Sequence, residues 1–429
     1  MKEPVITEEK PPLALLLSIR DTKTSREEAD SLARELTDLV RTLGLEISAH
    51  DMVHTREKNA RYGVGSGKAE ELAQKAADLQ VHCIIFDRDL SPSQQRNWEE
   101  LPFCKEAGIS VIDRQELIIR IFASRARTRE AELQVSLAEL NYALPRLQHK
   151  YIDLSRQRGG SYGTRGSGET RFETDRRKVE QRIKRLEEEL EDVKRQRQVQ
   201  RKQRERQGVP VCTLVGYTNA GKSSVLNALT GAAVLAEDKL FATLDPTSRR
   251  LELPRGMQII LVDTVGLIRR LPHNLVNAFR ATLEELGNAD ILINVIDASD
   301  QDAVKQYETT FSVLKEFNAE KIPVITVLNK TDKPESDGNM DVLQGICPDG
   351  IPISAKDGLG LADLCERLEA ALSGTKKFYR FPVERSDLAA LLHRSGQVYS
   401  ENYRESYIEM EAQVDDRTAS RLKEYLING

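Results

Sequence analysis

The sequence has few of the residues that build metal centres and disulfide frameworks. Its 429 residues include five cysteines, which lie far apart and form no CxxC pair. This spacing argues against a structural zinc site and against a disulfide framework, and it favours a reducing cytosol. The cysteines are Cys83, Cys104, Cys212, Cys347 and Cys365.

Histidines and long apolar runs are also scarce. His50 and His54 have the i,i+4 spacing of a helix, but no cysteine or carboxylate partner follows, so we expect a structural role and assign no metal. The apolar run Leu13 to Ile19 is much shorter than a bilayer span of about 20 residues, and the acidic residues before it do not form the basic flank of a signal peptide. We therefore expect a cytoplasmic protein without membrane insertion.

What is present is a polar, globular composition. Charged residues make up 31% of the chain, apolar residues 39% and aromatic residues 5%, which suffices for ordinary cores under a very polar surface. The length predicts two to four domains. We expect a monomer.

The first part of the chain, residues 1–125, reads as an α/β domain. Short apolar runs predict strands, and a longer amphipathic segment predicts a helix. The strands are Leu13 to Ile19, Val81 to Phe86 and Ile109 to Ile112, and the helix is Ser25 to Leu43.

Residues 126–207 have the pattern of an antiparallel helical hairpin. Two apolar stripes recur at steps of four and three on either side of a glycine-rich gap, so their seams are expected to pack together and the gap to form the tip. The first stripe is Leu133, Leu137, Leu140, Leu144 and Leu147, and the second is Val179, Ile183, Leu186, Leu190 and Val193.

Two further domains complete the prediction, and the fold class is α/β. Residues 208–373 alternate strands with helices, which predicts an α/β domain with a parallel sheet. Residues 374–429 predict a small α+β domain, with Ile408, Met410, Ala412 and Val414 on one face of a strand. The predicted strands of the central domain are Val211 to Val215, Met257 to Val262, Ile291 to Ile296 and Val324 to Leu328.

The segment from Gly216 to Ser223 matches the phosphate-binding pattern GxxxxGK[ST] between a strand and a helix. Its glycines allow backbone N–H groups to surround the α and β phosphates at a helix N-terminus. Lys222 is predicted to reach the β and γ phosphates, and the Ser223 hydroxyl to bind Mg²⁺.

Three later motifs make residues 208–373 a predicted P-loop GTPase domain, and the last two of them point to guanine rather than adenine. Asp263-Thr-Val-Gly266 follows a strand, where Asp263 can hold the metal's water shell and the Gly266 amide can meet the γ phosphate. In Asn329-Lys-Thr-Asp332, the Asp332 carboxylate can accept from both N1–H and N2–H₂ of guanine. Ser354-Ala-Lys356 would place a backbone amide against the guanine O6. Each motif is weak alone, but the four occur in order at strand ends.

The sequence specifies the residues that hydrolyse GTP less completely than those that bind it. Between the first two motifs, Thr243 is our choice to complete Mg²⁺ coordination, and Thr247 is the alternative. Leu267 stands where many small GTPases carry a water-orienting glutamine. Asn219 could help to bind K⁺ beside the phosphates, or it could simply be tolerated in the loop.

The predicted catalytic residues are Lys222, Thr243, Gly266 and Asn219, and the predicted Mg²⁺ ligands are Ser223 and Thr243. The whole predicted GTP site consists of Gly216, Tyr217, Thr218, Asn219, Ala220, Gly221, Lys222, Ser223, Phe241, Ala242, Thr243, Leu244, Asp245, Asp263, Thr264, Val265, Gly266, Asn329, Lys330, Thr331, Asp332, Ser354, Ala355 and Lys356.

With these motifs the chain resembles the HflX family of translation-factor-class GTPases over roughly residues 10–373. The resemblance implies binding to the large ribosomal subunit, with the hairpin reaching toward the peptidyl-transferase centre, and a role in splitting or rescuing stalled ribosomes under stress. It also implies a hydrophobic residue at the glutamine position. Besides the nucleotide motifs, the matching segments are Val64 to Lys68, Arg125 to Thr128, Leu133 to Val135, Gly159 to Asp175, Phe241 to Pro246 and Asp263 to Pro272.

The hairpin carries independent evidence for RNA. Residues 146–206 hold 19 lysines and arginines against 11 aspartates and glutamates. Arginines among glycines at the tip suit phosphates and unpaired bases, although charge patterning alone favours a solvated coiled coil. The predicted RNA-binding residues are Arg156, Arg158, Arg165 and Arg171.

A second glycine motif, Gly63 to Lys68, opens a predicted helix. No apolar strand leads into it and no Ser or Thr follows the lysine, so a structural turn is the preferred interpretation. Because some members of the family are reported to use ATP through this domain, adenine-nucleotide binding stays an alternative.

Three functions compete at this point. The preferred one is a GTPase stimulated by the ribosome; the others are a GTP-regulated switch that acts on protein effectors without RNA, and a scaffold that nucleotide merely stabilises. Stimulation of GTP turnover by large subunits distinguishes them.

Overall fold

The structure, a computed structural model, describes residues 11–56, 59–157, 167–207, 209–232, 240–270, 285–373, 376–414 and 416–427. These residues form two compact units. One holds the described residues up to Leu190 and the other those from Glu191 onward. The domain boundaries expected at residues 125, 207 and 373 stay predictions.

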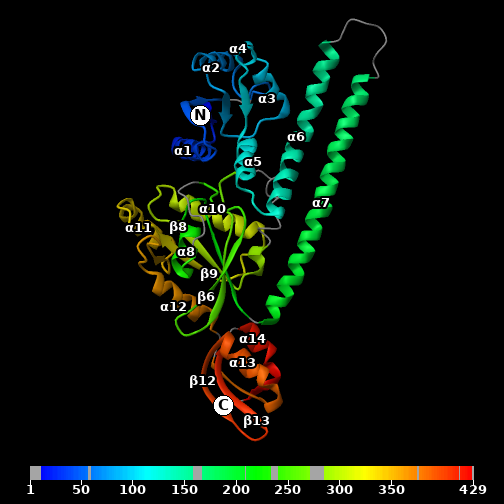
Figure 1. Cartoon of the computed structure of the whole chain (residues 1–429). Helices are drawn as coiled ribbons and strands as arrows, with labels where there is room; N and C mark the ends of the chain where they lie inside the picture. Colours follow the sequence, from blue (N-terminus) through cyan, green and yellow to red (C-terminus); the bar gives the residue numbers. More distant parts are fainter. Residues whose placement is uncertain are drawn as a thin grey trace, which may run out of the picture. The chain divides into compact units, whose positions relative to one another are not determined.

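A parallel four-stranded sheet, in the order β2-β1-β3-β4, forms the centre of the N-terminal part (Figure 1). The predicted strands and helix are confirmed within one or two residues. Burial on both faces explains the continuous apolar runs of β1 and β3. The strands are β1 (Leu13–Arg20), β2 (Glu46–His54), β3 (Cys83–Phe86) and β4 (Ser110–Ile112), and the helices are α1 (Arg26–Thr42), α2 (Ser66–Asp78), α3 (Pro92–Glu99), α4 (Pro102–Ala107) and α5 (Arg114–Arg125).

Strand β2 corrects the helical interpretation of His50 and His54, which both lie on this edge strand. Its mostly half-buried, polar sequence lacks the apolar run that identifies a central strand. His50 Nε2 lies 2.9 Å from Ser18 Oγ on the adjacent strand, and burial lowers the His50 pKa. The glycine motif at residues 63–68 forms a turn and the start of α2, with Gly65 as the N-cap residue.

The predicted hairpin is formed by two long helices, α6 (Arg129–Gln157) and α7 (Ser167–Gln207) (Figure 1). The two predicted stripes are buried only in part: Leu133 and Leu137 of α6 and Leu186 and Leu190 of α7 are buried, whereas the remaining six members are half-buried. Arg129 of α6 forms an ion pair with Glu189 of α7.

The predicted RNA-binding arginines are only partly described. Arg156 and Arg171 have helical backbone in α6 and α7, so the prediction that both lie in the loop is wrong. The glycine-rich gap was assumed to extend further than it does. Arg158 and Arg165 lie outside the described residues.

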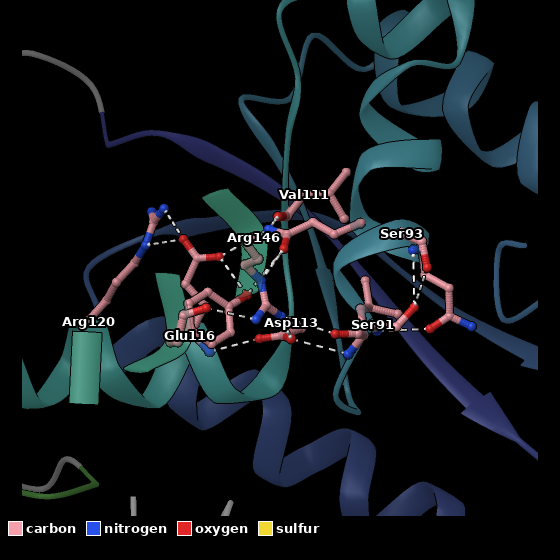
Figure 2. Close-up of polar contacts among 11 residues, drawn as sticks. Ser91, Ser93, Val111, Asp113, Glu116, Arg120 and Arg146 are labelled. Atoms are coloured by element: carbon pink, nitrogen blue, oxygen red, sulfur yellow. Dashed lines mark hydrogen bonds and ion pairs between the residues drawn. The ribbon is translucent and has the colours of Figure 1, made fainter. Parts of the chain in front are cut away.

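A buried polar cluster joins α6 to the N-terminal sheet (Figure 2). We call Asp113, Arg146, Gln95, Tyr142 and Glu116 the Asp113 cluster. Arg146 Nη2 donates to Asp113 Oδ2 at 3.0 Å and its Nε donates to Gln95 Oε1 at 2.7 Å. The Arg146 guanidinium also lies 3.4 Å from the centre of the Tyr142 ring. The first hairpin helix is thus fixed to the end of β4 by an ion pair and hydrogen bonds, while the stacking of Arg146 on Tyr142 orients the guanidinium within α6.

The second unit contains a six-stranded sheet in the order β10-β9-β8-β5-β7-β6, parallel except for β6, which runs antiparallel to β7 (Figure 1). The four predicted strands are confirmed. Strand β6 was not predicted, and Thr247, the alternative Mg²⁺ ligand, is its first residue. The strands are β5 (Val211–Gly216), β6 (Thr247–Glu252), β7 (Gln258–Asp263), β8 (Ile291–Asp297), β9 (Val324–Asn329) and β10 (Ile351–Pro352), and the helices are α8 (Lys222–Thr230), α10 (Ala303–Glu316), α11 (Glu335–Ile346) and α12 (Leu361–Leu372).

The C-terminal residues form an antiparallel sheet in the order β12-β13-β11-β14, with a helix-covered core. The predicted strand face is confirmed, since Ile408, Met410, Ala412 and Val414 are all buried. The elements are β11 (Lys376–Pro382), α13 (Ser386–Ser395), β12 (Gly396–Tyr403), β13 (Tyr407–Val414), α14 (Asp416–Arg421) and β14 (Leu426–Ile427). Of the helices in the described ranges, none is both long enough and apolar enough to cross a membrane.

Candidate nucleotide site

The four predicted motifs meet at the carboxyl edge of the six-stranded sheet. They follow β5, β7, β9 and β10, and ligands of open α/β sheets bind at this edge. A cavity of about 310 Å³ lies among them. It is lined by Thr218, Asn219, Gly221, Lys222, Ser223, Ser224, Phe241, Ala242, Thr243, Thr264, Gly266, Asn329, Lys330, Asp332, Lys333, Ala355 and Lys356.

Two glycines of the loop after β5 admit no side chain. Gly216 has a φ of +139°, and a Cβ there would lie 2.2 Å from the Val295 carbonyl oxygen. Gly221 has a φ of +96°, and its Cβ would lie 2.2 Å from Asn329 Nδ2. The loop can therefore take its path only with glycine at both positions.

Lys222 lies in the first turn of α8 and is almost fully buried. Its Nζ donates to the carbonyl oxygens of Tyr217 at 2.7 Å and of Gly216 at 3.1 Å. Burial lowers the Lys222 pKa to about 8; the Asp263 carboxylate raises it and the Lys330 ammonium lowers it. A cation held in a low-dielectric site is well suited to an anionic ligand.

Ser223, Thr243 and Asp263 converge from α8, the loop before β6 and the end of β7. Ser223 Oγ lies 2.7 Å from Thr243 Oγ1 and donates to Asp263 Oδ2 at 2.6 Å. Asp263 is fully buried, and burial raises its pKa against the effects of Lys222 and Ser223. Its Oδ1 has no hydrogen-bond partner in the described parts of the chain. Two hydroxyls and a buried carboxylate oxygen form a donor set that fits a hard cation such as Mg²⁺.

Asn329 connects three loops. Its Nδ2 donates to the Ala220 carbonyl oxygen at 2.9 Å, and its Oδ1 accepts from the Ala355 N–H at 3.1 Å. Lys330 Nζ donates to the Asn219 carbonyl oxygen at 2.8 Å and pairs with Asp297 at 2.7 Å. The motif Asn329 to Asp332 thus carries two side chains that hold the phosphate loop.

Asp332 lines the cavity at the end predicted for the base. Its Oδ1 accepts from the Ser354 hydroxyl at 2.9 Å, which orients the carboxylate, and the exposed Lys356 ammonium lies 4.0 Å from Oδ2. Ser354 is itself buried behind the cavity.

The structure brings most of the predicted site residues to the cavity wall. Some predicted residues do not line the cavity: Gly216, Tyr217, Ala220, Leu244, Asp245, Asp263, Val265, Thr331 and Ser354. Ser224 and Lys333 line the cavity and were not predicted. Both directly follow a predicted motif residue, and this adjacency was the only signal in the sequence.

Comparison with known proteins gives a consistent family. Three family models match: "GTP-binding GTPase N-terminal" over residues 30–123, "GTP-binding GTPase Middle Region" over 125–204 and "50S ribosome-binding GTPase" over 211–330.

Two relatives match along almost their whole length. The chain is 45% identical to GTPase HflX of Akkermansia muciniphila, covering 96% of each chain, and 41% identical to GTPase HflX of Caldanaerobacter subterraneus, covering 94% of this chain and 92% of the relative. A crystal structure of a GTP-binding protein from Sulfolobus solfataricus in complex with GDP is 25% identical, with 84% of this chain and 98% of that chain covered and a TM-score of 0.45. The chain belongs to the HflX family of GTPases.

Proposed function

We propose that this chain binds GTP with Mg²⁺ at the cavity above the six-stranded sheet, hydrolyses it, and uses the cycle on the large ribosomal subunit, where it splits or rescues stalled ribosomes under stress. It does so as a cytoplasmic monomer. The observation that supports the nucleotide site best is the convergence of four motifs on one cavity. A buried lysine lines this cavity, and the nearby Asp263 keeps a carboxylate oxygen that has no hydrogen-bond partner among the described residues.

Different residues of the chain contact the phosphates, the base and Mg²⁺. Lys222 and the loop amides hold the phosphates, Gly266 meets the γ phosphate and Asp332 reads the guanine edge. Ser223 and Thr243, with Asp263 behind them, would hold Mg²⁺, which neutralises charge on the β and γ phosphates when bound. Leu267 is buried, so its side chain cannot orient water in the cavity. We propose that Asn219 recruits K⁺, which would supply part of the missing positive charge.

The proposed ribosomal role is supported by the basic charge of the hairpin and by the family match. The hairpin carries the surplus of basic residues, and residues 211–330 match a family described as 50S ribosome-binding. RNA backbones attract such basic elements through their phosphates.

The decisive experiment compares GTP turnover with and without purified large subunits. Stimulation supports the proposal. Turnover that ignores ribosomes supports a switch for protein effectors, and an absence of turnover with and without subunits supports a nucleotide-stabilised scaffold.

The hairpin tip can be tested separately. Replacing Arg156, Arg158, Arg165 and Arg171 by alanine should abolish the stimulation and leave intrinsic turnover intact. Pelleting with large subunits across a salt series should show a shallower log–log slope for the variant, because fewer counterions are released. A variant that binds and responds like the parent would remove the tip from the RNA-binding role.

Base recognition has its own test in Asp332→Asn. The introduced amide can pair with the xanthine base but does not match the guanine donors. Binding of GTP should therefore weaken by about 2 to 4 kcal/mol, and the affinity for xanthosine triphosphate should rise. An unchanged GTP titration would exclude Asp332 from reading the base.

A further inference from the structure

The loop after β5 and the segment after β7 stay joined beyond the ends of their strands. The Thr218 N–H donates to the Leu267 carbonyl oxygen at 2.8 Å, and the Leu267 N–H donates to the Gly216 carbonyl oxygen at 3.1 Å. An isolated parallel bridge pairs Tyr217 with Leu267. Two residues lie between Leu214 and Tyr217, whereas three lie between Asp263 and Leu267, so the second segment bulges.

Gly266 lies in this bulge and is pressed against the phosphate loop. A Cβ on Gly266 would lie 2.7 Å from the Cα of Thr218, so the two backbones touch directly. Gly266 also lines the cavity. Any shift of the following residues would therefore move the Gly266 amide relative to the phosphates.

The Tyr217 side chain extends the contact past the backbone bridge. Tyr217 is buried, and its hydroxyl accepts from the Arg269 N–H at 2.9 Å. Its own carbonyl oxygen accepts from Lys222 at 2.7 Å. One residue is thus bonded both to the phosphate-binding lysine and to the segment that carries Gly266.

We infer that Tyr217 is a positioning residue for GTP hydrolysis: its hydroxyl holds Leu267 to Arg269 against the phosphate loop and so fixes the Gly266 amide where the γ phosphate is bound. The inference rests on the proposed GTPase activity. GDP lacks the γ phosphate, so the hydroxyl affects the step that follows GTP binding and not the affinity for GDP.

The test is Tyr217→Phe, which removes one oxygen and keeps the ring. We expect kcat to fall about tenfold, the effect of losing one well-placed hydrogen bond in the reacting arrangement. GDP affinity should stay within about twofold, since the loop amides and Lys222 are untouched. Amide exchange in residues 264–270 should become faster, because the Arg269 N–H loses its acceptor.

Tyr142→Phe is the matched control. Tyr142 is similarly buried, and its hydroxyl donates to Glu116 at 3.1 Å and to Gln95 at 3.3 Å in the other unit. It should lower the unfolding midpoint without changing kcat of the folded protein or exchange in residues 264–270.

The possible results test the positioning role of Tyr217 and the proposed GTPase function separately. Parent-like kcat and exchange in Tyr217→Phe would overturn the positioning role, and an equal loss of GDP affinity and kcat would make Tyr217 a general binding residue instead. Absence of turnover in the parent would overturn the proposed function, and the kinetic claim with it, while the exchange measurement would still decide whether the hydroxyl holds the segment.

Discussion

The Asp113 cluster and the nucleotide site each bury a carboxylate beside a cation, but only the first satisfies it completely. Asp113 accepts from the Glu116 N–H at 2.8 Å, the Leu90 N–H at 3.1 Å and Arg146 at 3.0 Å (Figure 2). Asp263 accepts from Ser223, but its Oδ1 has no hydrogen-bond partner in the part of the chain that the structure describes.

The difference shows how a buried charge can indicate its role. A carboxylate whose oxygens are all bonded within the chain stabilises the fold, since each donor would otherwise be buried without a partner. A carboxylate that keeps an unsatisfied oxygen beside a buried lysine retains a desolvation cost that a ligand can offset. Burial alone does not separate the two, because both groups are fully buried and burial raises both pKa values.

The largest expected effect is on the Asp113 cluster. Asp113→Ala leaves three donors without an acceptor, so the free energy of unfolding should fall by about 3 to 5 kcal/mol. Trp98 is the only tryptophan and lies in the N-terminal core, so its fluorescence during denaturant unfolding reports on this unit. A loss below about 1 kcal/mol would contradict the structural role. Addition of Arg146→Ala should cost less than the sum of the two single changes, since both remove the same ion pair and the second change removes in addition the Arg146 bond to Gln95.

Asp263→Asn should reduce GTP turnover without reducing stability. GTP turnover is expected to fall about 100-fold, or about 2.7 kcal/mol, because the group behind the two hydroxyls loses its charge. Thermal stability without nucleotide should be unchanged or higher, since a buried charge that the fold does not fully satisfy is removed. A large drop in the melting temperature would place Asp263 in the same class as Asp113.

A smaller effect is expected from the titration of Lys222. Its pKa of about 8 means that the unliganded protein loses this charge as the pH rises through 8, and phosphate prefers the charged form. Nucleotide affinity should therefore fall above pH 8 by up to about tenfold per pH unit, which GDP titrations between about pH 7 and pH 9.5 would measure. The pKa of Asp113, about 6, lies below this range, so its titration should not shift the Trp98 unfolding midpoint there. Constant affinity across the range would show that Lys222 stays charged.

The smallest effect concerns Asn219. GTP hydrolysis should be a few-fold faster in K⁺ than in Na⁺, and Asn219→Ala should remove that difference. The same exchange of salts should leave Trp98 unfolding unchanged. Equal rates of the parent protein in both salts would rule out the cation mechanism.

The sequence predicted the elements whose signal is local. Apolar runs located the central strands, and the phosphate loop could be found because its glycines are required at fixed positions. Strands β2, β6 and β12 were missed, since their exposed or half-buried residues do not form apolar runs. The Asp113 cluster could not be predicted, because Asp113 and Arg146 are 33 residues apart and meet only through packing. For the same reason the Tyr217 hydroxyl bond to Arg269, 52 residues away, was not foreseen.

The Asn329 bonds to Ala220 and Ala355 have an entropic consequence. Three loops that would otherwise have to be ordered one by one around a ligand are already held together by a single amide group. The conformational entropy lost in ordering them belongs to folding and not to association, which leaves more of the contact energy available as affinity. The proposed base and phosphate contacts are in this way preorganised together, although the residues proposed to make them come from distant parts of the chain.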